Sequence, residues 1–121
     1  MLEVRTCLFA AILAIAALGC GGAPKPDAQI ASSEGAIRGA EEAGASSVPE
    51  ATLHVKLAQE ERQQALAIIK DGGDNHRAAM ILARSEADAE LAVALARAAA
   101  AKADAAKAQE SVDALKQKEA P

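Results

Sequence analysis

The sequence DNHRAAMILARSEADAELAVALARAAAAKADAAKAQESVDALKQK, residues 74–118, contains neither Gly nor Pro. Small and apolar residues recur in it in alternating steps of four and three, the spacing of a heptad seam along one helix face. The seam residues are Ala78, Leu82, Ser85, Ala89, Ala92, Ala96, Ala99, Ala103 and Ala106. Ile81, Leu91 and Leu95 flank this seam and widen its apolar stripe. The pattern predicts one long helix over residues 74–118 that packs closely on its neighbours, because Ala side chains let helix axes approach.

Two shorter helices are predicted before it, over residues 27–43 and 49–70. Asp27 is a good N-cap for the first, and Gly44 is placed to end it in the left-handed conformation. Gly35, Gly39 and Gly44 either form a close helix-contact face or are small residues without such a role. The run SVPE (residues 47–50) has the form of a capping box, and DGGD (residues 71–74) predicts a turn with Asp74 capping the third helix.

The large aliphatic residues show where the helices stop packing on each other. Beyond residue 20 there are seventeen Val, Ile, Leu or Met residues, and fifteen lie at or before Leu95. We therefore expect the second helix to cover the third from Asn75 to about Arg97, with residues 98–118 projecting alone. The predicted fold class is all-α: a signal peptide, then a three-helix antiparallel bundle or helical hairpin with a long, Ala-rich, projecting third helix.

The N-terminus predicts export. Residues 7–18, CLFAAILAIAAL, form an apolar run of twelve residues, too short for a membrane span of about 20 residues and typical of a secretory signal peptide. The following ALGCGG (residues 17–22) resembles the lipobox of bacterial lipoproteins. That resemblance implies a signal peptide over residues 1–19, cleavage between Gly19 and Cys20, and a lipid anchor on Cys20. A plain signal peptide with a structural Cys, or an uncleaved anchor, is the alternative.

A linker is predicted next. Residues 20–26 hold the Cys and a flexible segment rich in Gly and Pro. Because GG follows the Cys where an Asp would retain a lipoprotein in the inner membrane, the lipoprotein resemblance implies an outer-membrane location facing the periplasm. The predicted helical domain covers residues 27–121.

Composition excludes several classes of function. The chain has 121 residues, 13 basic and 17 acidic side chains, a net charge of −4, one Phe and no Tyr or Trp. A nucleic-acid binder needs a basic surface, so nucleic acid is not an expected partner.

His54 and His76 fall at opposite ends of the predicted hairpin, so we expect no metal site. The pairs Glu41-Glu42 and Glu60-Glu61 are interpreted as solvated, and Ser85 as a small seam residue. We expect no catalytic residue, cofactor or small-molecule substrate.

A family resemblance covers about residues 28–101. The run AIRGAEEAGA (residues 36–45), Pro49, a Leu/Ala helix, the DGGD turn and RSEADAELA (residues 84–92) resemble the bacterial family known as domain of unknown function 4398. Members of that family are often envelope lipoproteins and no activity is established for it. The resemblance therefore implies a helical fold and an envelope location only.

These patterns predict a non-enzymatic envelope lipoprotein that acts as a helical spacer or adaptor. The lipid on Cys20 attaches it to the membrane, and the seam at Ala99, Ala103 and Ala106 contacts a second copy or another envelope protein. The alternative is a chaperone-like or stress-protective protein whose amphipathic helices coat other surfaces in the periplasm.

Overall fold

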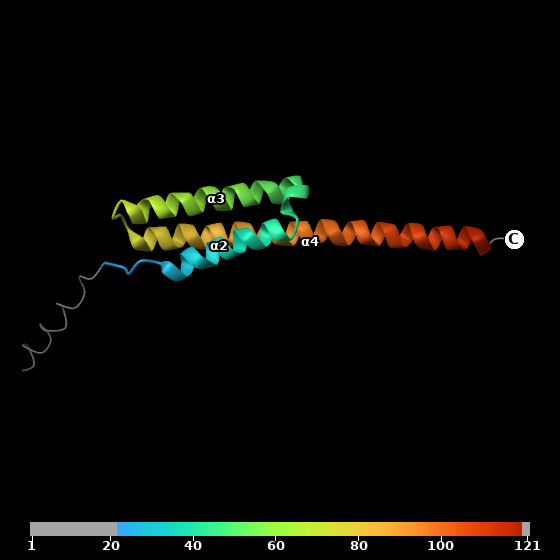
Figure 1. Cartoon of the computed structure of the whole chain (residues 1–121), viewed down its shortest axis with the longest axis horizontal. Helices are drawn as coiled ribbons and strands as arrows, with labels where there is room; N and C mark the ends of the chain where they lie inside the picture. The colour runs from blue at the N-terminus through green and yellow to red at the C-terminus, as the bar shows by residue number, and fades with distance from the viewer. Residues whose placement is uncertain (1–21, 120–121) are drawn as a thin grey trace, which may run out of the picture.

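The computed structural model describes residues 22–119 (Figure 1). Within this range the chain forms three α-helices, α2 (Asp27–Glu42), α3 (Pro49–Lys70) and α4 (Asn75–Glu119), and one short 3-10 helix, η2 (Ala45–Ser47). None of these residues lies in a β-strand. The predicted all-α fold with three helices is therefore confirmed. The predicted signal peptide, residues 1–19, lies outside the described residues.

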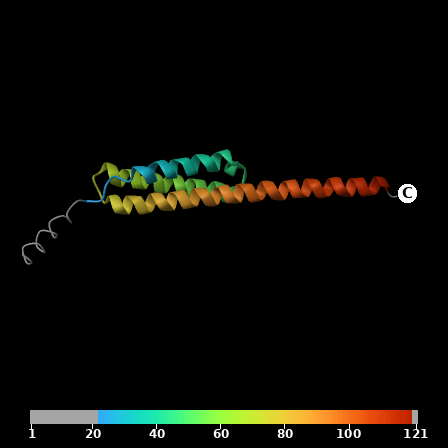
Figure 2. The same ribbon diagram turned by 90° about the horizontal axis from the view of Figure 1, so that it is seen from below.

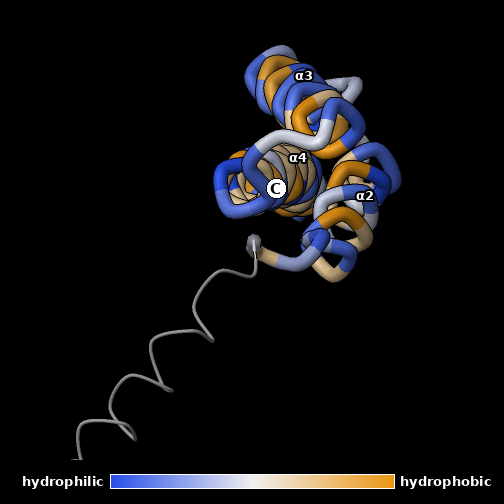
Figure 3. Tube along the Cα trace, turned by 90° about the vertical axis from the view of Figure 1, so that its left-hand side faces the viewer, coloured by the Kyte–Doolittle hydropathy of each residue, from blue (hydrophilic) through white to orange (hydrophobic). Residues whose placement is uncertain are grey.

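The three helices form a bundle in which the middle helix runs antiparallel to the other two. Viewed end-on, α2, α3 and α4 stand at the corners of a triangle (Figure 3). The longest helix, α4, packs against both α2 and α3, while the contact between α2 and α3 is smaller. The chain enters beside the start of α4, and the far end of α4 lies at the opposite end of the molecule (Figure 1).

The ends of α2 are set by Pro26 and Gly44. Helix α2 begins at Asp27, and the preceding N-cap residue is Pro26, which has no side-chain capping bond. The predicted N-cap is therefore wrong by one position, because Pro26 fixes the backbone before the first turn. Gly44 adopts φ 84 and ψ 26, and its N–H donates to the Glu41 carbonyl at 3.0 Å. This left-handed termination confirms the prediction for Gly44.

The start of α3 differs from the predicted capping box. The N-cap is Val48, in an extended conformation and without a side-chain capping bond, and Ser47 is exposed. The reason is the η2 turn, in which the Ser47 N–H donates to the Gly44 carbonyl at 3.0 Å. Thr52 Oγ1 instead reaches back into this junction, 3.0 Å from the Ala45 carbonyl oxygen.

The turn between α3 and α4 follows the predicted pattern. Gly72 has φ 69, and the Gly73 N–H donates to the Ile68 carbonyl at 2.8 Å, so glycine ends α3. Asp74 Oδ1 then accepts hydrogen bonds from the N–H groups of His76 and Arg77, at 2.8 and 3.2 Å. Asp74 therefore caps α4 as expected.

The heptad seam of α4 is the side that packs against α2 and α3. We call its buried part the core seam: Ala78, Leu82, Ser85, Ala89, Ala92 and Ala96. Ile81 and Leu95 are half-buried and pack beside it. Leu91 was expected to do the same, but it is 43% exposed. That expectation is wrong because Leu91 turns away from α2 and α3 on the far side of α4.

The core is small-residue packing in two apolar clusters. One cluster lies toward the η2 end and includes Ile37, Ala40 and Val55, and the other lies toward the α3–α4 turn around Leu82. The largest fully buried side chains are those of Leu82, Ser33 and Ser85. Added Cβ atoms at Gly35 and Gly39 would meet nothing within 4 Å, so these glycines do not form a close helix-contact face.

Burial stops near Ala96 although the helix continues. Residues 100–119 are all exposed, and only Ala99 is half-buried beyond residue 96. At about 1.5 Å per residue, the part of α4 after Ala96 extends about 35 Å past the bundle. It projects as a single straight helix beyond α2 and α3 (Figure 2). The bundle therefore ends near Arg97, and the following residues project, as the distribution of large aliphatic residues predicted.

Candidate functional site

The three residues predicted to bind a partner lie on the projecting part of α4. Ala99 is half-buried at the rim of the bundle, whereas Ala103 and Ala106 are fully on the exposed segment. They continue the register of the core seam, so the face that packs against α2 and α3 inside the bundle is uncovered beyond it. We call these three residues the seam extension.

The exposed helix around the seam extension is stabilised by its own side chains. Gln109 Nε2 donates to Asp113 Oδ1 at 3.0 Å, and Ser111 Oγ donates to the Lys107 carbonyl at 2.9 Å. Lys116 and Lys118 lie in the last turn, where positive charge favours the helix C-terminus. High Ala content and the contact between Gln109 and Asp113 support a helix without tertiary packing, whereas a Ser hydroxyl bonded to the carbonyl four residues earlier does not add to helix stability.

The predicted lipidation and cleavage residues, Cys20 and Gly19, lie outside the described residues. The linker next to them is held against the bundle. Asn75 Nδ2 donates to the Ala23 carbonyl at 2.8 Å, Lys25 pairs with Asp27 at 3.1 Å, and Pro26 is buried. These contacts place the described N-terminal end at the start of α4, opposite the seam extension.

A cluster of polar side chains joins α3 to α4 alongside the apolar clusters. His54 Nδ1 lies 2.8 Å from Asp88 Oδ1, and these side chains are 21% and 25% exposed. Glu61 Oε1 lies 2.7 Å from Arg84 Nη2. Beside them Ser85 Oγ, fully buried, donates to the Ala58 carbonyl at 2.6 Å. This cluster fixes how far α3 can slide along α4, because each contact needs one register.

Glu61 is the most perturbed group of this cluster. Its side chain is 13% exposed, and its Oε2 atom is buried without a hydrogen-bond partner. Burial raises the pKa of the Glu61 carboxyl above its ordinary value of 4.5, the Arg84 guanidinium lowers it, and the nearby Asp88 charge raises it further. Glu60 is exposed as expected, but the expectation of a solvated Glu61 is wrong, because Glu61 turns into the helix interface.

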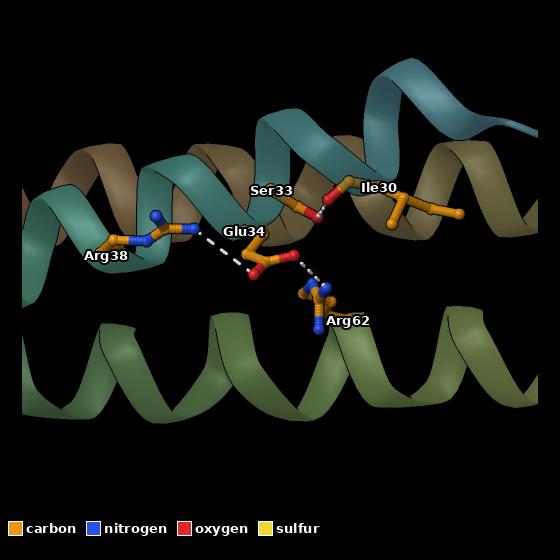
Figure 4. Close-up of polar contacts among 5 residues, drawn as sticks. All are labelled: Ile30, Ser33, Glu34, Arg38 and Arg62. Carbon is orange, nitrogen blue, oxygen red and sulfur yellow. Dashed lines mark hydrogen bonds and ion pairs between the residues drawn. The ribbon is translucent and has the colours of Figure 1, made fainter.

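A second polar group joins α2 to α3. Glu34 lies between two cations: Arg62 of α3 at 2.8 Å and Arg38 of its own helix at 3.4 Å (Figure 4). Gln59 Nε2 donates to Glu41 Oε1 at 3.1 Å. Glu34, Arg62 and Gln59 line an open surface groove with Ile37 and Gln63. This groove is open and lies between two helices, where Arg62 Nη2 pairs with Glu34 while the Arg62 Nε atom is buried without a hydrogen-bond partner.

His54, Glu61 and Asp88 do not line either of two surface grooves that run along α3, and a general acid acts in a pocket that also holds substrate. Ser85 has its hydroxyl engaged by a backbone carbonyl. Residues 22–119 contain no group of three or more His, Cys, Asp or Glu side chains arranged to hold a metal ion. No helix in this part of the chain is both long enough and apolar enough to cross a membrane.

Sequence patterns missed the polar contacts between α3 and α4. The only signal for them was the polar run QEERQQ at residues 59–64, which interrupts the apolar stripe of α3. The run does not say which of its members faces α4. The pairing of His54 with Asp88, 34 residues apart, depends on the register of the two helices.

Comparisons with protein-family models, with curated protein sequences and with solved structures find no match to this chain. Function is therefore inferred from the geometry and from the sequence patterns.

Proposed function

We propose that this protein is a non-enzymatic spacer or adaptor of the bacterial cell envelope, whose projecting helix binds a partner through the seam extension. The observation that carries the proposal is the bare part of α4. Residues 100–119 are exposed, yet Ala103 and Ala106 keep the register of the core seam. A face with the pattern of a packed helix, and with no helix on it, favours a binding role.

The two ends of the molecule suit different tasks. The described N-terminal end is tied to the start of α4 through Asn75 and Ala23, and the seam extension lies at the other end of the bundle. A lipid on Cys20 would hold the first end at a membrane surface, where two or more acyl chains give stable attachment. The projecting helix would then reach about 35 Å beyond the bundle.

Location and family belong to the same proposal. The apolar run at residues 7–18 and the ALGCGG segment support export and lipidation, with the outer membrane facing the periplasm as the destination. Membership of the domain of unknown function 4398 family, proposed from residues 28–101, would agree with an envelope lipoprotein. The absence of a convergent acid, base and pocket among the described contacts supports a role without catalysis.

The test is crosslinking in the cell that produces the protein. The full chain carries a photoreactive residue at position 103, and crosslinked products are identified by mass. A product with another envelope protein, or with a second copy, is expected. A photoreactive residue at Gln64, an exposed position of α3, is the control and should not give this product. If position 103 gives no product above the Gln64 control, the seam extension is not a partner site.

The same product should depend on the Ala side chains. With the photoreactive residue moved to Ala106, replacing Ala99 and Ala103 with Glu places charges on the seam and should remove the association, while Gln109→Glu adds a charge elsewhere on the segment and should keep it. The chaperone-like alternative predicts low helicity without a lipid or partner and no cooperative thermal unfolding. Circular dichroism of the purified protein distinguishes the two, because the spacer requires a stably folded helix.

A further inference from the structure

The face of α4 opposite the seam is also apolar along its length. A helix turns by about 100° per residue, so residues two positions away from a seam residue point to the other side. We call this line of exposed residues the back stripe. It consists of Met80, Ala83, Ala87, Leu91, Ala94, Ala98, Ala101, Ala105, Ala108, Val112 and Leu115.

The back stripe holds most of the exposed large apolar side chains of the described residues. Met80 is 61% exposed, Leu91 43%, Val112 43% and Leu115 64%, and the remaining two, Leu53 and Leu57, lie on α3. Because α2 and α3 pack on the opposite face of α4, neither covers the stripe. A contiguous exposed apolar surface of this kind is typical of an interaction site.

The spacing of the stripe specifies a helical partner. From Leu91 to Leu115 the steps are three, four, three, four, three, four and three, which is a heptad repeat with every core position apolar. The repeat spans about 36 Å of helix. Ala at these positions allows a close approach of two helix axes.

The stripe is complementary to itself when reversed. Its residues form pairs placed symmetrically before and after position 103. Leu91 and Leu115 each lie twelve residues from position 103, and Ala94 and Val112 each lie nine residues from it. Ala98 and Ala108 each lie five residues from it, and Ala101 and Ala105 each lie two residues from it. We propose that the back stripe binds a second copy of this chain in antiparallel orientation. The two-fold axis passes between the two helices at the level of position 103, whose own side chain lies on the opposite face of α4. Leu91 then packs on Leu115 of the second copy, and Ala94 on Val112 of the second copy. Such a contact is isologous and closes as a dimer.

The charges beside the stripe decide between the two orientations. In the antiparallel pair, Glu90 faces Lys118 of the second copy, and symmetry makes this opposite-charge contact twice. A parallel pair matches the apolar layers equally well but brings Arg97 against Lys102 of the second copy, twice. The antiparallel pair has like-charge contacts only at the axis. There Lys102 meets Lys102 of the second copy, and Asp104 meets Asp104 of the second copy. Both are exposed, where like charges cost a few tenths of a kcal/mol.

This inference rests on the proposed function, in which the projecting helix binds a partner. It adds a second binding face, the back stripe, and names its partner as a second copy of this chain. The antiparallel dimer puts the two bundles at opposite ends, with the seam extension of each chain still uncovered. Because Ala layers bury little area, we expect a weak dimer whose population depends on the protein concentration.

The first test is self-crosslinking of the full chain in its own cell, from a photoreactive residue at Ala108. A product of twice the chain mass is expected. Cleavage after Lys and Arg separates residues 98–102 from residues 108–116, so the site of attachment reports orientation. Attachment to residues 98–102 is expected for the antiparallel dimer. Attachment to residues 108–116, a product with another protein, or no product would each overturn the proposal.

The second test is charge exchange on the outer layers. Leu91→Glu with Leu115→Glu puts like charges in contact and should reduce the self-crosslinked product about tenfold, the equivalent of about 1.4 kcal/mol. Leu91→Lys with Leu115→Glu should recover it, because each Lys then meets a Glu of the second copy. In a parallel dimer like charges would still meet, so failure to recover would contradict the proposal.

A seam variant separates this inference from the proposed function. Ala103→Glu lies on the opposite face and should leave the Ala108 self-crosslink intact, while removing the partner product obtained from a photoreactive residue at Ala106. Loss of the self-crosslink in Ala103→Glu would contradict a dimer through the back stripe. Because all substituted side chains are exposed, the variants should keep the helicity of the unchanged protein by circular dichroism.

Discussion

The hydroxyl oxygen of Ser85 on α4 lies 2.6 Å from the carbonyl oxygen of Ala58 on α3, and both residues are fully buried. This hydrogen bond crosses the interface between the two longest helices, beside the polar side chains that join α3 to α4. A small side chain is required there because the Ala-lined interface leaves little space. The contact therefore sets both the spacing and the register of α3 on α4.

Substitutions at Ser85 should separate spacing from hydrogen bonding. Ser85→Ala keeps the small size and loses one hydrogen bond, so we expect a cost of about 1 kcal/mol in the free energy of unfolding. Ser85→Leu overfills the interface and should cost more, about 1 to 3 kcal/mol or above. Urea unfolding followed by circular dichroism measures both. Equal costs for the two variants would mean that α3 and α4 are not closely packed at this level.

Two glycines near the end of α2 should respond in opposite directions to the same substitution. Gly44 has φ 84 while Gly39 is helical, and an added Cβ meets nothing within 4 Å at either position. Gly44→Ala should therefore lower the free energy of unfolding by about 1 to 2 kcal/mol through backbone strain. Gly39→Ala should raise it by about 0.5 to 1 kcal/mol. Thermal unfolding of both variants checks this, and stabilisation by Gly44→Ala would contradict the left-handed turn.

Glu61 should make stability depend on pH in a direction opposite to that of most acidic residues. Burial raises its pKa above the ordinary 4.5 in the folded protein, so the folded state binds more protons than the unfolded state between these two values. The Glu61 contribution is therefore most favourable below the unfolded pKa and decreases as pH rises through the folded pKa. The free energy of unfolding of the unchanged protein, minus that of Glu61→Gln, should fall as pH rises across that window and should then level off.

The control for Glu61 is its exposed neighbour. Glu60→Gln removes an exposed carboxyl group from the adjacent position of the same helix and is the matched control. Chemical unfolding of the three proteins at a series of pH values from about 4 to 7 provides the comparison. A difference between the unchanged protein and Glu61→Gln that rises with pH would indicate that the Arg84 ion pair outweighs burial.

The projecting helix should contribute little to the stability of the bundle. Removing residues 101–121 deletes described residues that are all exposed, so the free energy of unfolding should change by less than about 0.5 kcal/mol. The helical signal should fall in proportion to the residues removed. Thermal unfolding at low protein concentration measures this without a contribution from association. A loss above about 1 kcal/mol would show that the segment packs on its own bundle.

Much of the fold follows from local sequence patterns. The absence of Gly and Pro over residues 75–118 determines one long helix, Gly44 and Gly72 end the shorter helices through their positive φ angles, and Asp74 caps α4. These features depend on residues close in sequence, so single-chain patterns are sufficient to predict them. The four-three spacing likewise identified the buried side of α4, because helical periodicity places those residues on one face.

The tertiary structure alone decided which groups meet across the helices. The pairing of His54 with Asp88, the burial of Glu61 rather than Glu60, and the exposure of Leu91 all depend on how each helix is rotated and where it lies along its neighbour. The same applies to the η2 turn, which moved the N-cap of α3 from Ser47 to Val48. Sequence periodicity determines which residues share a face of a helix. Only packing against α2 and α3 decides which apolar face of α4 is buried and which remains exposed.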